Sequence, residues 1–341
     1  MKKSILLFVA LFSMSANVFA DGLTATLQQG DVMTPFYGVD AYKQAYEAAT
    51  DGAVITLSSG QFNTVSNLAK SVTVVGVCAF YGRMERTILN AGFTISANNV
   101  KLEGIFCDYT ISLGTVTNCH VRRCYVNTLT SSSTHTNTLI DQCVVYYDGA
   151  IKNGKNYTIQ NSTIDYFIET NSNSNIANIS NCYIHDWYRR GVSAIKQPIA
   201  IYRNNVLGLN NSSKFSGSNY VYSSNITIPL SSPSEFYYNY FYRYNSYSSS
   251  YEAYCTTPSY ATGCVNIGNS NSIASSPYKS SFSYPNKEAS FGNGQDGTPR
   301  GIMRGNGFSE YPDIPRIVDK QIDANTNAEG KINVKITVET K

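Results

Sequence analysis

A short pattern repeats along this chain at a spacing of 19 residues. Copies begin at Asn99, Asn118, Asn137 and Asn156, and a further copy begins at Ile176 after a spacing of 20. Aligned, the copies share three mostly apolar columns: Leu102, Val121, Ile140, Ile159 and Ile179; Ile105, Cys124, Cys143, Ser162 and Cys182; and Cys107, Val126, Val145, Ile164 and Ile184. A fixed period of about 20 residues is typical of a solenoid, in which each repeat forms one coil stacked on the next.

The length and residue types of the repeat indicate strands. The unit is too short for two packed helices, which need about 33 residues or more. Its apolar positions lie two apart and are rich in β-branched residues, as in strands. Polar pairs such as Arg122-Arg123 suit a bend, and the asparagines that open the copies tolerate left-handed backbone and can form a ladder of amide hydrogen bonds. We therefore predict an all-β fold, a right-handed parallel β-helix. The structural rival is a leucine-rich horseshoe, whose Leu consensus is absent.

Four segments are expected. Residues 1–20 are predicted to be a signal peptide, 21–52 an N-terminal segment with a cap helix, 53–270 the parallel β-helix, and 271–341 an irregular segment ending in a strand. The helix is predicted over Val39 to Thr50, with Asp40 as its N-cap. Because a solenoid exposes a raw apolar end, we expect this helix to cover it.

The repeat is expected to continue past Ile184 with longer coils. Three further copies are predicted, each as a triplet of inward residues: Ile201, Asn204 and Val206; Val221, Ser224 and Ile226; and Phe236, Asn239 and Phe241. The alternation over Lys331 to Val338 predicts a terminal strand that pairs with an edge or covers the far end.

The N-terminus predicts export. Lys2 and Lys3 precede an apolar run, and the segment ends at Ala20, so we expect a secreted, periplasmic or cell-surface protein that begins near Asp21. No other apolar run approaches the roughly 18 residues of a membrane span. Without Lys2 and Lys3, 24 of the 26 basic residues stand against 23 acidic ones, a balance that argues against nucleic acid as a partner. We expect a monomer.

Most of the eight cysteines are expected to be free and packed. Cys124, Cys143 and Cys182 share one inward column and Cys107 occupies another, where small apolar thiols fit. Cys255 and Cys264 lie in the irregular region, and a disulfide between them is one of two open readings.

The signal, the helix followed by DGAVITLSSGQF, and the Asn- and Cys-marked coils resemble secreted bacterial proteins of the pectin-lyase-like β-helix superfamily. The likeness covers Val39 to Ile267, and the segment from GIMRGNGF to KINVKITVE resembles the tails of such proteins. The resemblance implies the fold. It leaves the activity open, because the superfamily mixes lyases, hydrolases, epimerases, adhesins and proteins without known activity.

Chemistry on this fold is expected on outward strand positions, where reactive side chains cluster on two neighbouring coils. The candidate catalytic residues are Asp165, His185, Asp186, Arg189 and Arg190. A polysaccharide lyase would use Asp165 and Asp186 for part of a calcium site and an arginine as base, although calcium prefers six or more oxygens. A glycosidase would need two carboxyl groups about 6.5–9.5 Å apart. No other cofactor and no other metal is expected. A second polar patch is formed by His120, Arg122 and Arg123, and His135 is expected to be solvated in a Ser/Thr-rich loop.

Carbohydrate binding without catalysis needs only an aromatic and polar platform. Tyrosine and tryptophan rings stack on the apolar faces of sugars. The candidate substrate-binding residues on or beside one outward face are Tyr125, Tyr146, Tyr183 and Trp187. We therefore expect a protein that binds an extracellular glycan, with a polysaccharide lyase or glycoside hydrolase as one alternative and a purely structural or protein-binding solenoid as the other.

Overall fold

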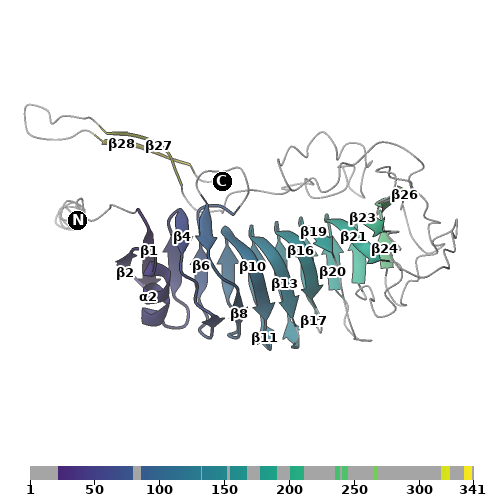
Figure 1. Cartoon of the computed structure of the whole chain (residues 1–341), viewed down its shortest axis with the longest axis horizontal. Coiled ribbons are helices and arrows are strands. Elements are labelled where there is room, and N and C mark those ends of the chain that lie inside the picture. The colour runs from purple at the N-terminus through teal and green to yellow at the C-terminus, as the bar shows by residue number, and fades with distance from the viewer. Residues whose placement is uncertain are drawn as a thin grey trace, which may run out of the picture.

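The computed structural model describes residues 22–79, 86–131, 133–151, 154–166, 177–189, 200–210, 235–238, 240–244, 265–266, 316–322 and 334–339. In these residues the chain winds into a parallel β-solenoid whose strands stack along one long axis (Figure 1). The expected parallel β-helix is therefore confirmed. Residues 1–20 and the cysteines at positions 255 and 264 lie outside the described residues.

Two long sheets and one short sheet form the walls. Sheet A runs in the order β2 (Val32–Tyr37), β1 (Thr24–Gln29), β3 (Val54–Leu57), β6 (Thr73–Val75), β9 (Lys101–Glu103), β12 (His120–Arg122), β15 (Leu139–Asp141), β18 (Thr158–Gln160), β20 (Ala177–Ser180), β22 (Ala200–Arg203) and β24 (Glu235–Tyr237). From β3 onward its neighbours are parallel, as expected for successive coils.

Sheet B contains the second strand of each coil. It runs through β4 (Gly60–Phe62), β7 (Thr87–Leu89), β10 (Ile105–Leu113), β13 (Tyr125–Ser131), β16 (Val144–Ile151), β19 (Thr163–Tyr166), β21 (Tyr183–Arg189), β23 (Val206–Asn210), β25 (Tyr240–Tyr244) and β26 (Val265–Asn266), with β5 (Asn67–Leu68) and β8 (Phe93–Ile95) joining at β10. Sheet C is short: β11 (Val116–Thr117), β14 (His135–Thr136) and β17 (Gly154–Lys155).

Left-handed residues turn each coil at two places. The first column is the predicted one, Asn99, Asn118, Asn137 and Asn156, with φ of 59°, 56°, 53° and 52°. The second lies at the bend between sheets A and B and contains Gly104, Arg123, Gln142, Asn161, Asn181, Asn204 and Tyr238. The predicted amide ladder also forms, because Asn118 donates to Asn99 at 3.3 Å and Asn137 donates to Asn118 at 3.2 Å. These turns let strands as short as three residues close a coil.

The aligned columns fill the interior. Leu102, Val121, Ile140, Ile159 and Ile179 are all at most 1% exposed, and so are Cys124, Cys143 and Cys182. The six described cysteines are free and buried, which confirms the expectation of packed thiols for them. Polar residues in the column are satisfied: the Ser162 hydroxyl accepts from the Cys143 amide at 3.0 Å and donates to the Gln160 carbonyl at 2.7 Å.

Two predictions about the later coils are wrong. Tyr202, not Ile201, pairs with Ile179, so Asn205 rather than Asn204 fills the column beside Cys182. The expected coil through Val221 also does not lie between its neighbours, because β22 pairs directly with β24 and β23 pairs directly with β25. The triplet that begins at Phe236 has the predicted phase, since Phe236 pairs with Tyr202.

A helix and a hairpin close the N-terminal end. Helix α2 (Ala41–Ala48) lies against β1, β2 and β3 and buries Ala41, Tyr42, Ala45 and Tyr46, which places it as the expected cap. Asp40 is its N-cap residue by position, but its carboxylate accepts a hydrogen bond from Asn63 at 2.7 Å instead of capping the helix. The antiparallel pair β1–β2 extends sheet A beyond the first coil and was not predicted.

The predicted terminal strand exists as β28 (Val334–Glu339) and pairs antiparallel with β27 (Arg316–Ile322). In the part of the chain that the structure describes, the only helix has eight residues, and none is long and apolar enough to cross a membrane.

Candidate functional site

One outward column of sheet B is buried, whereas Asp108 and Asn127, two residues further along their strands, are exposed or half-buried. In register, the buried column contains Phe106, Tyr125, Val144, Thr163 and Tyr183. Their exposed fractions are 6%, 3%, 0%, 0% and 0%. Cys78 and Ala79 belong to the same apolar cluster as Phe106, Tyr125 and Val144, outside the coils.

Aromatic rings stack along this buried column. The centroids of Phe106 and Tyr125 lie 4.7 Å apart with an interplanar angle of 17°, and those of Tyr125 and Tyr146 lie 6.0 Å apart. The guanidinium of Arg86 lies over Phe106 at 4.4 Å from the ring centroid. Stacking at these distances stabilises the coils. Tyr125 and Tyr183 therefore do not offer their ring faces to a sugar, whereas Tyr146 is half-buried at the edge of the stack.

The backbone pairing of β19 and β21 shows where the expected catalytic residues lie along the coils. β19 and β21 pair Ile164 with Ile184 and Tyr166 with Asp186, which puts Asp165 level with His185 on adjacent coils. Arg189 ends β21, after Trp187 in the same strand. The side chains of Asp165, His185, Asp186, Trp187 and Arg189, and the whole of Arg190, lie outside the described residues. The catalytic cluster therefore stays a prediction. Beyond this cluster, Leu207 pairs with Ile184 and is 0% exposed, so it points inward.

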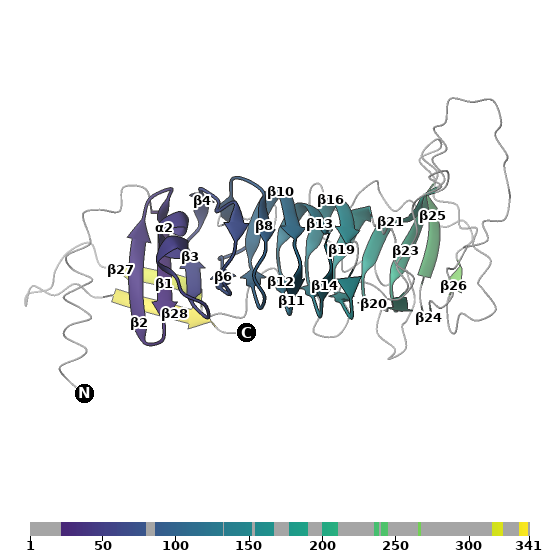
Figure 2. The same ribbon diagram turned by 90° about the horizontal axis from the view of Figure 1, so that it is seen from below.

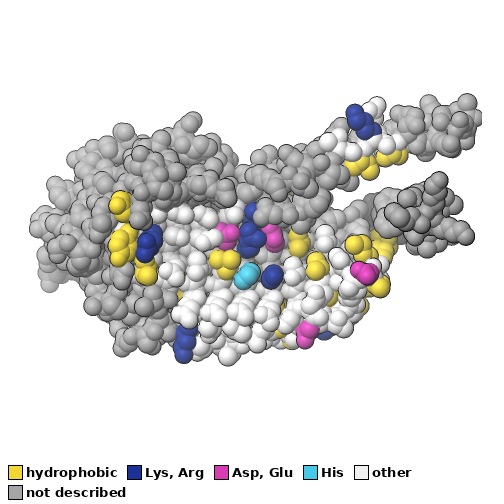
Figure 3. Space-filling model, turned by 180° about the vertical axis from the view of Figure 1, so that it is seen from behind, with side chains coloured by type: hydrophobic (Ala, Val, Ile, Leu, Met, Phe, Trp, Pro, Cys, Tyr) yellow, Lys and Arg dark blue, Asp and Glu magenta, His cyan; other side chains and the backbone are white. Residues whose placement is uncertain are grey.

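The outer face of sheet A is open and, apart from Leu139 and Ile201, polar. Two columns run along it, one through Lys101, His120, Leu139, Thr158, Asn178 and Ile201, and the other through Glu103, Arg122, Asp141, Gln160, Ser180 and Arg203. All of these residues except Asp141 are half-buried or exposed. In Figure 3, basic, acidic and histidine side chains lie together in the middle of this face. We call these two columns the polar face.

A buried carboxylate holds the centre of the polar face. Asp141 is 4% exposed and accepts hydrogen bonds from four side chains: Arg122 at 3.3 Å, Gln142 at 3.3 Å, Gln160 at 3.2 Å and Asn161 at 3.0 Å. Beside it the buried Arg123 pairs with Glu103 at 2.6 Å. Because each carboxylate oxygen is engaged across neighbouring coils, this network fixes the side chains around it.

His120 is the residue of the polar face whose ordinary side-chain pKa lies nearest to neutral pH. Partial burial lowers its pKa from the ordinary value, and the positive charges of Lys101 and Arg122 on the neighbouring column positions lower it further. The imidazole is therefore neutral at pH 7 and offers one donor and one acceptor. The predicted patch of His120, Arg122 and Arg123 is divided by the structure, since Arg123 is 4% exposed and belongs to the buried network.

His135 is not solvated as expected. It lies in β14 with 0% exposure, its Nδ1 is 2.9 Å from the Thr138 hydroxyl, and its ring is 5.6 Å from that of Tyr157. Burial lowers its pKa to about 4. The Ser- and Thr-rich sequence suggested a loop, but the residue fills an inward position of sheet C.

The chemistry of the polar face is that of hydrogen bonding. Its two carboxylates are occupied by arginines, and nowhere in the described ranges do three His, Cys, Asp or Glu side chains gather to hold a metal ion. Exposed or half-exposed amides, hydroxyls and cations recur from coil to coil, about 4.8 Å apart. Such a surface suits an extended ligand with repeated polar groups.

Sequence reasoning found part of this face and missed the rest. His120 and Arg122 were singled out, but Gln160, Asn178 and Arg203 were not. The repeat contained the signal for these residues. The neighbours before and after each inward residue of the column that begins with Leu102 point outward on the same face of sheet A.

Comparison with known proteins adds no relative: no protein family, no curated protein and no solved structure matches this chain.

Proposed function

We propose that the polar face binds an extended polysaccharide that carries little net charge. The observation that supports this proposal is the open, mostly polar run of side chains across consecutive coils of sheet A, beside a sheet B whose column from Phe106 to Tyr183 is buried. A stack of coils presents side chains at a regular step of about 4.8 Å, so a polymer with regularly spaced hydroxyl groups can meet a polar side chain on each coil.

The charges of the polar face favour a ligand of this kind. Arg122 pairs with Asp141 at 3.3 Å, and Arg203 lies over the ring of Tyr237 at 4.7 Å from its centroid. These two arginines are thus paired or stacked, which argues against a polyanion held mainly by them. Tyr237 adds a half-buried aromatic ring at the far end of the second column, of the type that stacks on sugars.

The proposed setting is outside the cytoplasm. It rests on the signal-like residues 1–20 and on the resemblance to secreted pectin-lyase-like proteins. Membership of that superfamily is part of the proposal. Mass measurement of the exported protein, with an N-terminus near Asp21, would support it.

Binding to an array of neutral and uronate polysaccharides tests the function. We expect binding to at least one neutral or weakly charged glycan, weakened about 2- to 10-fold by His120→Ala or Asn178→Ala, because each removes one side-chain hydrogen bond. Tyr109→Ala is the matched control, since Tyr109 is 50% exposed outside the polar face. Binding to no glycan, or equal losses in all three variants, would refute the proposal.

A polysaccharide lyase or glycosidase is the second candidate, favoured by the register that sets Asp165 level with His185. In that reaction His185 or Asp165 would move a proton, Arg189 or Arg190 would neutralise a carboxylate, and Asp186 would supply part of a calcium site in the lyase case. Release of reducing ends or unsaturated products, abolished by Asp165→Ala, would establish the enzyme. Binding without turnover would leave the first proposal standing.

A further inference from the structure

The exposed large apolar side chains of the described residues are concentrated in two places. Seven such residues exist: Val32, Met33, Tyr37, Val39, Tyr109, Val334 and Ile336, with exposed fractions between 39% and 66%. Four belong to β2 and the turn after it, and two belong to β28. Apolar surface concentrated in this way usually marks a contact with another element.

The hairpin of β27 and β28 is amphipathic. Val334 and Ile336 are 54% and 52% exposed and alternate along β28 with Lys335 and Thr337. The register pairs Ile322 with Val334, Lys320 with Ile336 and Ile317 with Val338, so by position one side of the hairpin combines five aliphatic residues with one lysine. A two-stranded hairpin is marginally stable in water by itself. Its apolar face therefore needs a partner surface.

Strand β2 offers such a surface at the edge of sheet A. Its outer side presents Met33, Pro35 and Tyr37, which lie opposite the polar residues Gln28, Thr26 and Thr24 of β1. Pro35 has no amide hydrogen to give to another strand, which disfavours extension of the sheet by edge pairing. Packing of two sheet faces requires only apolar side chains, and both elements have them.

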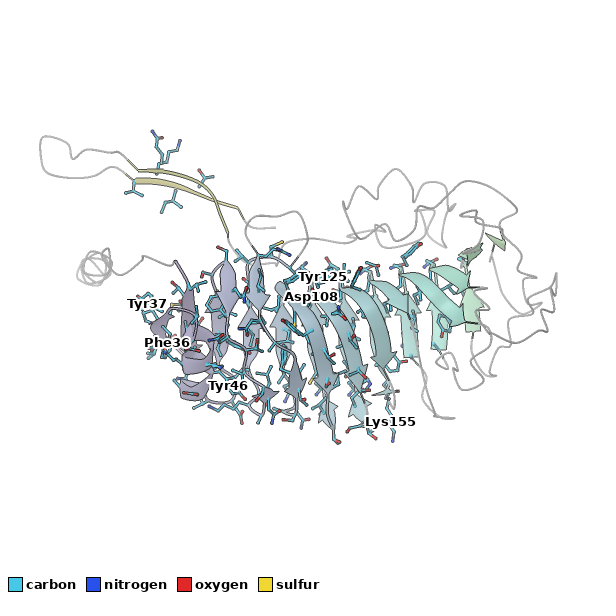
Figure 4. All side chains as sticks on the ribbon, viewed as in Figure 1. Phe36, Tyr37, Tyr46, Asp108, Tyr125 and Lys155 are labelled. Carbon is cyan, nitrogen blue, oxygen red and sulfur yellow. The ribbon has the colours of Figure 1, made fainter. Side chains whose placement is uncertain are left out.

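The chain can bring the two surfaces together. Between β26 and β27 lie 49 residues, which can span about 160 Å when extended. Sheet A has eleven strands, so it is about 50 Å long. In Figures 1 and 2 the hairpin lies toward the N-terminal end of the long axis, where β1 and β2 are also found. In Figures 3 and 4 its hydrophobic side chains are on the side turned toward the solenoid, with the longer polar side chains on the other.

We propose that the hairpin of β27 and β28 packs its apolar face on Met33, Pro35 and Tyr37 of β2 in the same chain. Because both surfaces belong to one chain, the contact is intramolecular and is favoured over a contact with a second copy at low protein concentration. The contact covers the N-terminal end of sheet A with an element from the opposite end of the sequence. It does not depend on the proposed function.

Cysteine cross-linking tests the contact. Met33→Cys with Ile336→Cys is treated with a short bismaleimide in a background of Cys255→Ser and Cys264→Ser, since the six described cysteines are buried. We expect a cross-link within one chain, identified by mass spectrometry. It should form at least 5-fold faster than in the control Met33→Cys with Lys335→Cys, whose second cysteine lies on the opposite side of β28 from residue 336. Equal rates, or no cross-link, would overturn the proposal. So would cross-links formed only between chains when the two single-cysteine variants are mixed, because they would assign the contact to a second copy.

Limited proteolysis provides a second readout. Ile336→Asp places a charge in the contact, whereas Thr337→Asp places the same charge on the opposite face of β28. We expect cleavage within residues 316–339 to be at least 5-fold faster in Ile336→Asp than in Thr337→Asp, with the circular dichroism of the solenoid unchanged in both. Equal cleavage rates would contradict the contact.

Discussion

Replacement of Asn118 by alanine tests whether the left-handed asparagine column stabilises the coils. Asn118 has φ of 56° and lies in the column between Asn99 and Asn137. A residue with a Cβ other than Asn or Asp pays about 1 kcal/mol or more for this conformation. Asn118 also donates to Asn99 at 3.3 Å and accepts from Asn137 at 3.2 Å, and each exposed bond contributes about 0.5 kcal/mol. We expect Asn118→Ala to lower the free energy of unfolding by about 2 kcal/mol.

Asn118→Gly is the matched variant. It removes the same two hydrogen bonds but adopts positive φ without strain, so it should be about 1 kcal/mol less destabilising than Asn118→Ala. Urea unfolding followed by circular dichroism measures both variants, with the slope of the transition as a check that the unfolding unit is unchanged. Equal destabilisation by alanine and glycine, or a larger effect of glycine, would refute the argument from backbone conformation.

Three further predictions concern buried polar groups. Asp141→Ala should lower the free energy of unfolding by about 3 kcal/mol, because it leaves Arg122, Gln142, Gln160 and Asn161 without their shared acceptor. Asp141→Asn should lower the free energy of unfolding by less, and the midpoints of urea unfolding measure both changes. His135, with its pKa lowered to about 4, stays neutral in the fold while the unfolded chain takes up a proton below about pH 6.5, so stability should fall as pH drops from about 6.5 to 4, by about 3 kcal/mol in total. His135→Phe should remove that part of the slope, and an unchanged slope would count against it. Burial raises the pKa of Cys107 to about 11 and that of Cys143 and Cys182 to about 12, so thiol reagents should label none of the three before unfolding; rapid labelling of Cys143 in the native protein would contradict the packing.

The fold was predictable because its information is local and periodic. A column such as Leu102, Val121 and Ile140 repeats at a constant step, and asparagine is a residue type that fits left-handed backbone. The phase of the coil after Ile184 was not predictable, because Asn204 and Asn205 are adjacent and either could fill the column. Only the pairing of Tyr202 with Ile179 decides it, with Asn204 at φ of 54° in the bend.

The candidate site was predicted less well, for a physical reason. Alternation along a strand tells which side chains point outward, but an outward side chain is exposed only if no other segment covers it. Tyr125 points outward and is 3% exposed, because it lies in an apolar cluster with Cys78 and Ala79, which are far away in sequence. The β1–β2 hairpin was missed although it had a signal, since Gly30 with φ of 60° and Asp31 form a two-residue turn between alternating segments.

Hydroxyl-radical footprinting with and without a bound glycan tests the central claim most directly. The proposal predicts that glycan binding protects His120 and Tyr237 on the polar face while Tyr109 oxidises at the same rate. Protection of Tyr109 with unchanged oxidation of His120 and Tyr237 would contradict the assignment of binding to sheet A.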